Sequence, residues 1–166
     1  MITFRETPVT DATAHALLAE YFAYRAETFP SAAGYVTTFP EPARFVEPDG
    51  VFLVVVVDGA SVGCGGIRSL GAVPGGAGGT GGLRFEVKHL WLRPSVQGRG
   101  LGRALLAELE RRAVLLGASE LVLDTNASLE AAGGLYRSSG YADVEPYNDN
   151  PNATNWYLKR LPRAAR

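Results

Sequence analysis

The chain of 166 residues is predicted to adopt an α/β fold, because strand patterns and helix patterns alternate along its second half. A β-hairpin comes first, two strand-to-helix units follow it, and a final strand closes the pattern. These segments cover residues 52–68, 85–117, 121–140 and 156–158. A chain of this length buries roughly two-thirds of its unfolded surface as one domain, so we expect a single domain over residues 1–166.

The first fifty residues predict one strand and one helix, followed by irregular chain. Ile2–Arg5 reads as a short strand, and Asp11 suits the N-cap of a helix whose apolar residues recur between Leu17 and Phe22. The prolines at positions 30, 40, 42 and 48 allow only short helices or loops after it.

The hairpin is the clearest local signal, and it joins Phe52–Val57 to Ser61–Arg68. The Asp58-Gly59 pair between the arms is typical of a type I′ turn. Five consecutive apolar residues in the first arm predict a strand covered on both faces. The lone cysteine, Cys64, lies in the second arm, where we expect a small buried residue rather than a nucleophile.

A low-complexity stretch, residues 71–82, follows the hairpin and is mostly glycine. Such a composition cannot pack into a core, so flexible linkage between two strands is the simpler interpretation. An active-site lid is the alternative.

The first strand-to-helix unit contains the glycine-rich connection Gln97-Gly98-Arg99-Gly100-Leu101-Gly102. The strand Phe85–Leu92 stops at Arg93-Pro94, because proline has no backbone donor for a ladder. Helical spacing begins at Gly102 and ends at Gly117, which suits a left-handed cap. A loop that enters a helix offers free N–H groups and the positive end of the helix dipole, so the connection predicts a phosphate site.

This connection matches neither of the common nucleotide motifs. No Gly-Lys-Ser/Thr follows it, as a Walker A loop requires, and Arg103 stands where a dinucleotide fingerprint has its third glycine. Taken alone, the glycines are also compatible with a plain tight turn.

The second unit runs from the strand Leu121–Thr125 to a helix that we expect Ser128 to cap and Gly140 to end. Gly133-Gly134 lies inside this helix, where each glycine costs about 1 kcal/mol relative to alanine. Close packing of the helix on the sheet would explain the pair.

Three motifs follow one another in the second half of the chain. They are Glu86-Val87-Lys88-His89-Leu90-Trp91-Leu92, the connection with Gln97, Gly100 and Gly102, and Leu135-Tyr136-Arg137-Ser138-Ser139-Gly140-Tyr141. In this order and spacing they resemble the GNAT family of N-acetyltransferases. The resemblance covers about residues 50–161, whereas the first fifty residues match loosely.

The resemblance implies a mixed, mostly antiparallel sheet of about seven strands, splayed near the middle, with helices on both faces. It implies acetyl-CoA as cosubstrate, with its pantetheine arm near Gly133-Gly134, and acceptor-side helices at about residues 11–45. A strand bulge after Leu90 would free a backbone N–H for the thioester oxygen. The cofactor-binding residues it implies are Leu90, Trp91, Leu92, Gln97, Gly98, Arg99, Gly100, Leu101, Gly102 and Arg103.

Acetyl transfer to an amine requires a base, because an alkylammonium has a pKa near 10. Glu86 is the first candidate, and the alternative is a structural carboxylate paired with Lys88 or an arginine. Asp124 on the next strand is the rival base, and its alternative is a capping carboxylate. Tyr136 matches the family's proton donor to the departing thiolate, unless it is only an aromatic core contact.

The amino-acid composition limits the kinds of partner that we expect this chain to bind. With 16 basic and 17 acidic residues the net charge is −1, which offers no electrostatic footprint for nucleic acid or an anionic membrane. His15 and His89 have no neighbouring ligands at metal spacing, so we expect no metal. A lone cysteine and the lack of a leader-like apolar segment favour the cytoplasm.

We therefore expect an acetyl-CoA-dependent N-acetyltransferase that acts on the primary amine of a small molecule by direct attack in a ternary complex. A non-catalytic acyl-CoA-binding module and an enzyme that acetylates a protein N-terminus or lysine are the alternatives. The polar turn Tyr147–Pro151 either lines the acceptor pocket or is a plain surface loop. The sequence leaves the oligomeric state open, a homodimer included.

Overall fold

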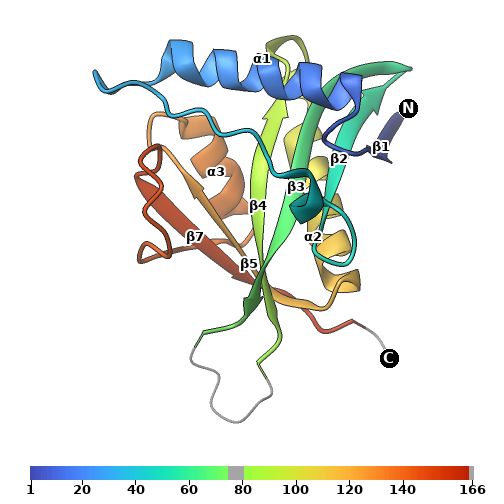
Figure 1. Cartoon of the computed structure of the whole chain (residues 1–166), viewed down its shortest axis with the longest axis vertical. Coiled ribbons are helices and arrows are strands. Elements are labelled where there is room, and N and C mark those ends of the chain that lie inside the picture. The colour runs from blue at the N-terminus through green and yellow to red at the C-terminus, as the bar shows by residue number, and fades with distance from the viewer. Residues whose placement is uncertain (75–80, 165–166) are drawn as a thin grey trace.

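The computed structural model describes residues 1–74 and 81–164, which form a seven-stranded sheet with helices on both faces (Figure 1). The strands are β1 (Ile2–Glu6), β2 (Gly50–Val57), β3 (Ala60–Ala72), β4 (Leu83–Leu92), β5 (Ala118–Thr125), β6 (Ala142–Val144) and β7 (Asn155–Arg160). The α-helices are α1 (Ala12–Thr28), α2 (Leu101–Leu115) and α3 (Glu130–Ser138), and the 3₁₀ helices are η1 (Pro42–Phe45) and η2 (Pro94–Val96). None of the helices in the described ranges has the length and hydrophobicity of a membrane span.

The strands are ordered β1-β2-β3-β4-β5-β7-β6, and β4 with β5 is the one parallel pair among these neighbours. The mixed, mostly antiparallel sheet that the resemblance implies is therefore confirmed. Strand β6, whose three residues are all exposed, was not predicted from the sequence. A fully exposed strand buries neither face, so no alternation of apolar residues marks it.

Two cores flank the sheet, and β2 contributes to both. Val51, Leu53 and Val55 pack in the core that contains the apolar face of α2. Phe52 and Val54 point the other way, into the core beneath α1. Side chains alternate across a strand, so a continuous apolar run needs cover on both faces. The prediction of a two-sided strand is confirmed.

Local signals in the sequence set most of the turns and helix ends. The Asp11 side chain accepts hydrogen bonds from the N–H groups of Thr13 and Ala14, as its predicted N-cap role requires. Asp58 and Gly59 have φ angles of 49° and 84°, the conformation of the predicted type I′ turn.

The predicted cap of α3 is wrong. The helix begins after Leu129, and no side chain caps it. Instead the Ser128 N–H donates to the Asn126 side chain at 3.0 Å. Ser128 is thus part of an Asx turn that precedes the helix, and α3 starts one residue later than a Ser128 cap predicts.

The glycine-rich stretch 71–82 is described only at its two ends. β3 includes its first residues, and the Val73 N–H donates to the Gly82 carbonyl at 3.0 Å across the base of the stretch. Residues 75–80 lie outside the described ranges, so the linker and lid interpretations both stay predictions.

The sheet splays between β4 and β5, which lie together at one end and diverge toward the other (Figure 1). Their pairing runs from Leu83 only to Glu86, which lies opposite Val122. Beyond this point β4 keeps its partner β3, but with a shift in register at His89 and Leu90. His89 has a φ of 57°, so the bulge begins before Leu90 rather than after it.

Candidate active site

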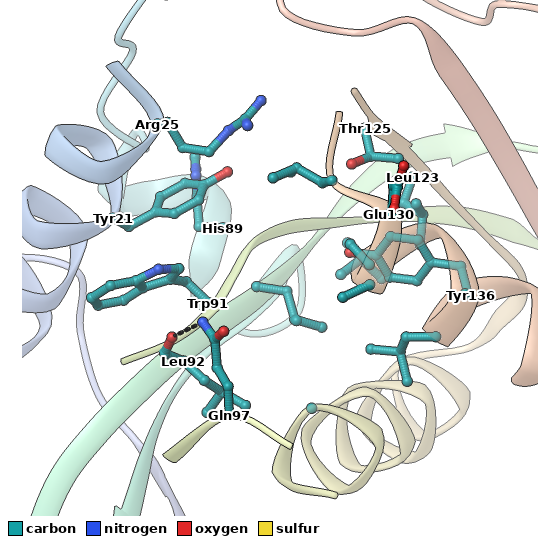
Figure 2. Close-up of a pocket in the computed structure, with 18 of the residues that line it drawn as sticks. Tyr21, Arg25, His89, Trp91, Leu92, Gln97, Leu123, Thr125, Glu130 and Tyr136 are labelled. Carbon is teal, nitrogen blue, oxygen red and sulfur yellow. Dashed lines mark hydrogen bonds between the residues drawn. The ribbon is translucent and has the colours of Figure 1, made fainter. Parts of the chain in front are cut away.

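A cavity of about 730 Å³ lies where β4 and β5 diverge. Its walls come from α1, the second half of β4, the connection into α2, the end of β5, α3 and residues 150–153. Figure 2 places Gln97 and Leu92 at one end and Arg25 at the other. We call the part formed by residues 97–103 the loop end, and the part formed by Tyr21, Tyr24, Arg25 and Tyr35 the α1 end.

The loop end has the geometry of an anion site. Gly98 and Gly100 have φ angles of 76° and 77°, which favour glycine, and a Cβ at either would meet no protein atom within 4 Å. Gly100 is the N-cap of α2, and no side chain caps this helix. The N–H groups of the first turn of α2 therefore have neither an intrahelical acceptor nor a side-chain cap, and the residues present fit a pyrophosphate.

Two side chains fasten this end to its surroundings. The Gln97 amide donates to the Leu92 carbonyl at 2.9 Å and so closes the connection onto the end of β4. Arg103 donates to the Ser138 hydroxyl at 2.8 Å, which ties the start of α2 to the end of α3. Arg99 is exposed and does not line the cavity.

The structure brings together the other residues predicted to bind the cofactor. Those that line the cavity are Leu90, Trp91, Leu92, Gln97, Gly98, Gly100, Leu101, Gly102 and Arg103. Of the candidate catalytic residues, Asp124 and Tyr136 line it and Glu86 does not.

Glu86 is an almost fully buried carboxylate with a complete set of partners. One oxygen accepts a hydrogen bond from Arg68 Nε at 2.8 Å and forms an ion pair with Arg68 Nη2 at 2.7 Å. The other accepts from the Tyr147 hydroxyl at 2.7 Å and lies 3.5 Å from Lys88 Nζ. Burial, with the charge of Glu86, raises the pKa of Tyr147, so this phenol stays protonated and keeps donating. This arrangement matches the structural alternative for Glu86.

Asp124 lies on the β5 wall of the cavity, beyond the point where β5 leaves β4. Lys88 Nζ is 3.1 Å from one of its oxygens, and the Asn148 amide donates to the other at 2.6 Å. Asn148 in turn accepts from the Trp156 indole at 2.9 Å. The polar turn after β6 is therefore fastened to the two carboxylates, and Asn150 from the same turn lines the cavity.

Tyr136 combines the two interpretations left open for it. Its ring packs against Tyr141 and Tyr157, with centroid distances of 6.1 and 5.8 Å, and it belongs to the main core. It also lines the cavity. Burial, and then the charge of Asp124, raises its pKa to about 12, so the phenol is protonated at neutral pH.

The resemblance implied acceptor-side helices at about residues 11–45, but no individual residue of the α1 end was predicted from the sequence. Tyr21, Tyr24 and Tyr35 form an aromatic wall, with Trp91 from β4, and Arg25 lies among them. One signal existed: Arg25 stands seven residues after Leu18, on the apolar face of the helix. A charged residue on a buried helix face needs a partner or a function.

His89 also lines the cavity, and Cys64 contacts its backbone. The Cys64 thiol donates to the His89 carbonyl at 3.5 Å; it is fully buried, and burial raises its pKa, which removes thiolate character. Burial, followed by the charges of Lys88 and Arg68, lowers the pKa of His89 to about 3, so the imidazole is neutral and too weakly basic to deprotonate an amine. Residues 1–74 and 81–164 contain no cluster of metal-ligating side chains.

Comparison with known proteins gives one family. Residues 12–141 match the Acetyltransferase (GNAT) family, so the match begins within α1 and not only at residue 50. The chain is 33% identical over 157 residues to the IAA acetyltransferase of Azospirillum brasilense, an alignment that covers 94% of each protein.

Solved structures share the fold at lower identity. A GNAT family acetyltransferase from Staphylococcus aureus superposes with a TM-score of 0.75 at 13% identity, covering 98% of this chain and 100% of that one. A GNAT family acetyltransferase from Elizabethkingia anophelis, with acetyl-CoA bound, superposes with a TM-score of 0.64 at 16% identity, covering 96% and 98%.

Proposed function

Because the chain belongs to the GNAT family and is an acetyl-CoA-dependent N-acetyltransferase, we propose that it acetylates the primary amine of a small molecule by direct attack in a ternary complex. One observation carries the proposal: a single cavity of about 730 Å³ joins the loop end to the α1 end. Two reactants held in one cavity react without a separate encounter. The alignment with the IAA acetyltransferase, an enzyme of a small molecule, supports this class of acceptor.

The loop end would hold the cosubstrate. The free N–H groups after Gly98 and Gly100 suit its pyrophosphate, and the unpaired edge of β4 from Leu90 to Leu92 suits its pantetheine amides. When bound, acetyl-CoA supplies the thioester carbonyl that the amine attacks and the thiolate that departs. A backbone N–H at the β4 bulge would stabilise the negative charge that develops on the carbonyl oxygen.

We assign the base to Asp124 rather than to Glu86. A base must reach the proton that it removes, directly or through one water. Asp124 lines the cavity, whereas Glu86 is covered by Arg68 and Tyr147. Lys88 would hold the Asp124 carboxylate in position from the β4 side, since it lies within 3.5 Å of both carboxylates.

Tyr136 would return a proton at the end of the reaction. Asp124 would first take one proton from the ammonium, which leaves a neutral amine with a free lone pair. As the C–N bond forms and the C–S bond breaks, the Tyr136 hydroxyl would give its proton to the departing thiolate. The second proton of the nitrogen would then restore the phenol, and Asp124 would release its proton to solvent. With a pKa of about 12 this phenol carries its proton at neutral pH. Cys64 is buried away from the cavity, so it is not a carrier of a covalent acetyl group.

A turnover screen tests the proposal. The protein is incubated with acetyl-CoA and panels of arylalkylamines, amino acids, polyamines and aminoglycosides, and released CoA and acetylated product are both measured. We expect equal amounts of CoA and N-acetyl product with one class of small amine. Binding of acetyl-CoA without transfer to any panel member would indicate an acyl-CoA-binding module. Transfer to peptide N-termini or lysines alone would move the acceptor class to proteins.

A further inference from the structure

Arg25 is a buried cation that the reaction described above does not use. It lies in the last turn of α1, is 4% exposed and lines the cavity. Figure 2 shows its guanidinium extending from α1 beside Tyr21, toward the wall that contains Thr125. It lies at the end of the cavity opposite Gln97, so it is remote from the phosphate-binding connection.

Within residues 1–74 and 81–164, Arg25 differs from the other buried charged side chains. Glu86 is paired with Arg68, and Glu120 is paired with Arg84. Arg25 has no carboxylate partner in these ranges, and its Nη1 atom is buried without any hydrogen-bond acceptor. A buried charge without a partner is costly. A ligand with an anionic group would remove that cost.

The surroundings of Arg25 hold its guanidinium in place and leave its donors free. The guanidinium carbon lies 5.2 Å from the ring centroid of Tyr35 and 5.7 Å from that of Phe29. Aromatic rings attract a cation through their faces but accept none of its in-plane N–H bonds. The planar fork is thus oriented in advance, which suits two parallel bonds to a carboxylate.

A second buried donor lines the same cavity. Trp91 Nε1 also lacks a hydrogen-bond partner in the described ranges. Together with Arg25 it gives this part of the cavity unsatisfied donors set among aromatic rings. An acceptor that carries acceptor oxygens and an apolar or aromatic body complements such a surface.

We propose that Arg25 binds the carboxylate of the acceptor, and that the acceptor is an amino-carboxylate with an aromatic side chain, such as an aromatic amino acid. This inference rests on the proposed function, because it names the acceptor of that reaction. The amine of such a ligand would extend from the α1 end toward Asp124, and its ring would contact Tyr21, Tyr24 or Tyr35.

Matched acceptors test the role of the carboxylate. L-Phenylalanine and 2-phenylethylamine differ only in this group, as do L-tryptophan and tryptamine. The wild type should show the higher kcat/KM with the amino acids. In Arg25→Gln the preference for each amino acid over its amine should fall by roughly 10- to 100-fold, the range for hydrogen bonds to charged groups. The preference of Arg25→Lys should lie between those of the wild type and Arg25→Gln. Arg111→Gln, on the exposed face of α2, is the matched control and should keep the wild-type preference.

A binding measurement separates this inference from the proposed function. 3-Phenylpropanoate has the ring and the carboxylate but no amine, so it binds without reacting. With CoA present, calorimetry should give an affinity that Arg25→Gln lowers at least tenfold, about 1.4 kcal/mol. If this holds while no amine is acetylated, the carboxylate site stands and the proposed function fails. Three results would overturn the inference. In Arg25→Gln, kcat/KM could fall equally for the amino acid and the amine of each pair, the KM for acetyl-CoA could rise instead, or the affinity for 3-phenylpropanoate could stay unchanged.

Discussion

The two ends of the cavity are built from different parts of the chain. The loop end is built from one short connection, residues 97–103, in which Gly98 and Gly100 have positive φ angles. The α1 end presents side chains from α1, β4 and the segment around Tyr35, which meet only when the chain has folded. A site made of backbone N–H groups would recognise the pyrophosphate, which every acetyl-CoA molecule carries. A side-chain site changes with single substitutions, so we expect acceptor choice to reside at the α1 end.

The two carboxylates near the splay of the sheet also differ in their surroundings. Glu86 is enclosed by Arg68, Lys88 and Tyr147, whereas Asp124, which Lys88 and Asn148 contact, borders the cavity. The first would stabilise the fold, and the second would act on a ligand.

The largest effect should follow Asp124→Asn, which keeps the size of the side chain and removes its basicity. Turnover should fall by about 10²- to 10⁴-fold at neutral pH, the range for loss of a general base, while the affinity for acetyl-CoA changes little. Steady-state kinetics and calorimetry measure the two quantities.

Glu86→Gln is the matched control for this change. It leaves the Arg68 charge without its partner, so it should lower the melting temperature more than Asp124→Asn does, with a smaller loss of turnover. A folded Glu86→Gln enzyme that loses more turnover than Asp124→Asn would return the base to Glu86.

Tyr136→Phe should have the next largest effect. Removing the hydroxyl should lower turnover by roughly 10- to 10³-fold and preserve the affinity for acetyl-CoA, because the lost interaction belongs to the transition state. The melting temperature should stay close to that of the wild type, since the ring still packs. Tyr157→Phe, in the same aromatic cluster but outside the cavity, is the control. Normal turnover in Tyr136→Phe would leave water as the proton source.

His89 makes the stability of the folded protein depend on pH. Its folded-state pKa of about 3 lies below the ordinary value of 6.5, so the stability that the neutral imidazole confers is complete above pH 6.5 and is lost as pH falls toward 3. Between pH 7 and pH 5 the wild type should lose about 2 kcal/mol more of its unfolding free energy than His89→Asn. Urea denaturation at both pH values measures this, and equal losses would show that His89 ionises alike in both states. Asparagine suits the position because it tolerates the φ of 57°.

The fold could be read largely from local signals. The Asp58-Gly59 turn, the Asp11 cap and the apolar run of β2 each act through nearby backbone or through strand periodicity. β6 was not predicted because it buries neither face, and α3 starts one residue later than predicted, after Ser128 has joined an Asx turn with Asn126. The bulge at His89 depends on pairing with β3, which no local pattern encodes.

The candidate site was likewise predictable where its residues are close together in the sequence, and not where they meet only in the folded chain. The residues predicted to bind the pyrophosphate are contiguous, so the glycine spacing and the family resemblance predict them as a group, and all of them except Arg99 line the cavity. The relation of Glu86 to the cavity depends on Arg68 from β3 and Tyr147 from a distant turn. The role proposed for Arg25 depends on its contacts with Phe29 and Tyr35 and on the wall across the cavity, and these surroundings exist only in the folded chain.

One cross-titration tests most directly whether the cavity has two separately built ends. The affinities for CoA and for 3-phenylpropanoate are measured by calorimetry in Gly100→Asp and in Arg25→Gln. Gly100→Asn serves as a control, because it adds similar bulk without charge and also tolerates a positive φ. Gly100→Asp should weaken CoA binding at least tenfold, about 1.4 kcal/mol, and should affect 3-phenylpropanoate far less, while Arg25→Gln should do the reverse. If either variant weakens both ligands equally while it stays folded, the division of the cavity into two ends is wrong.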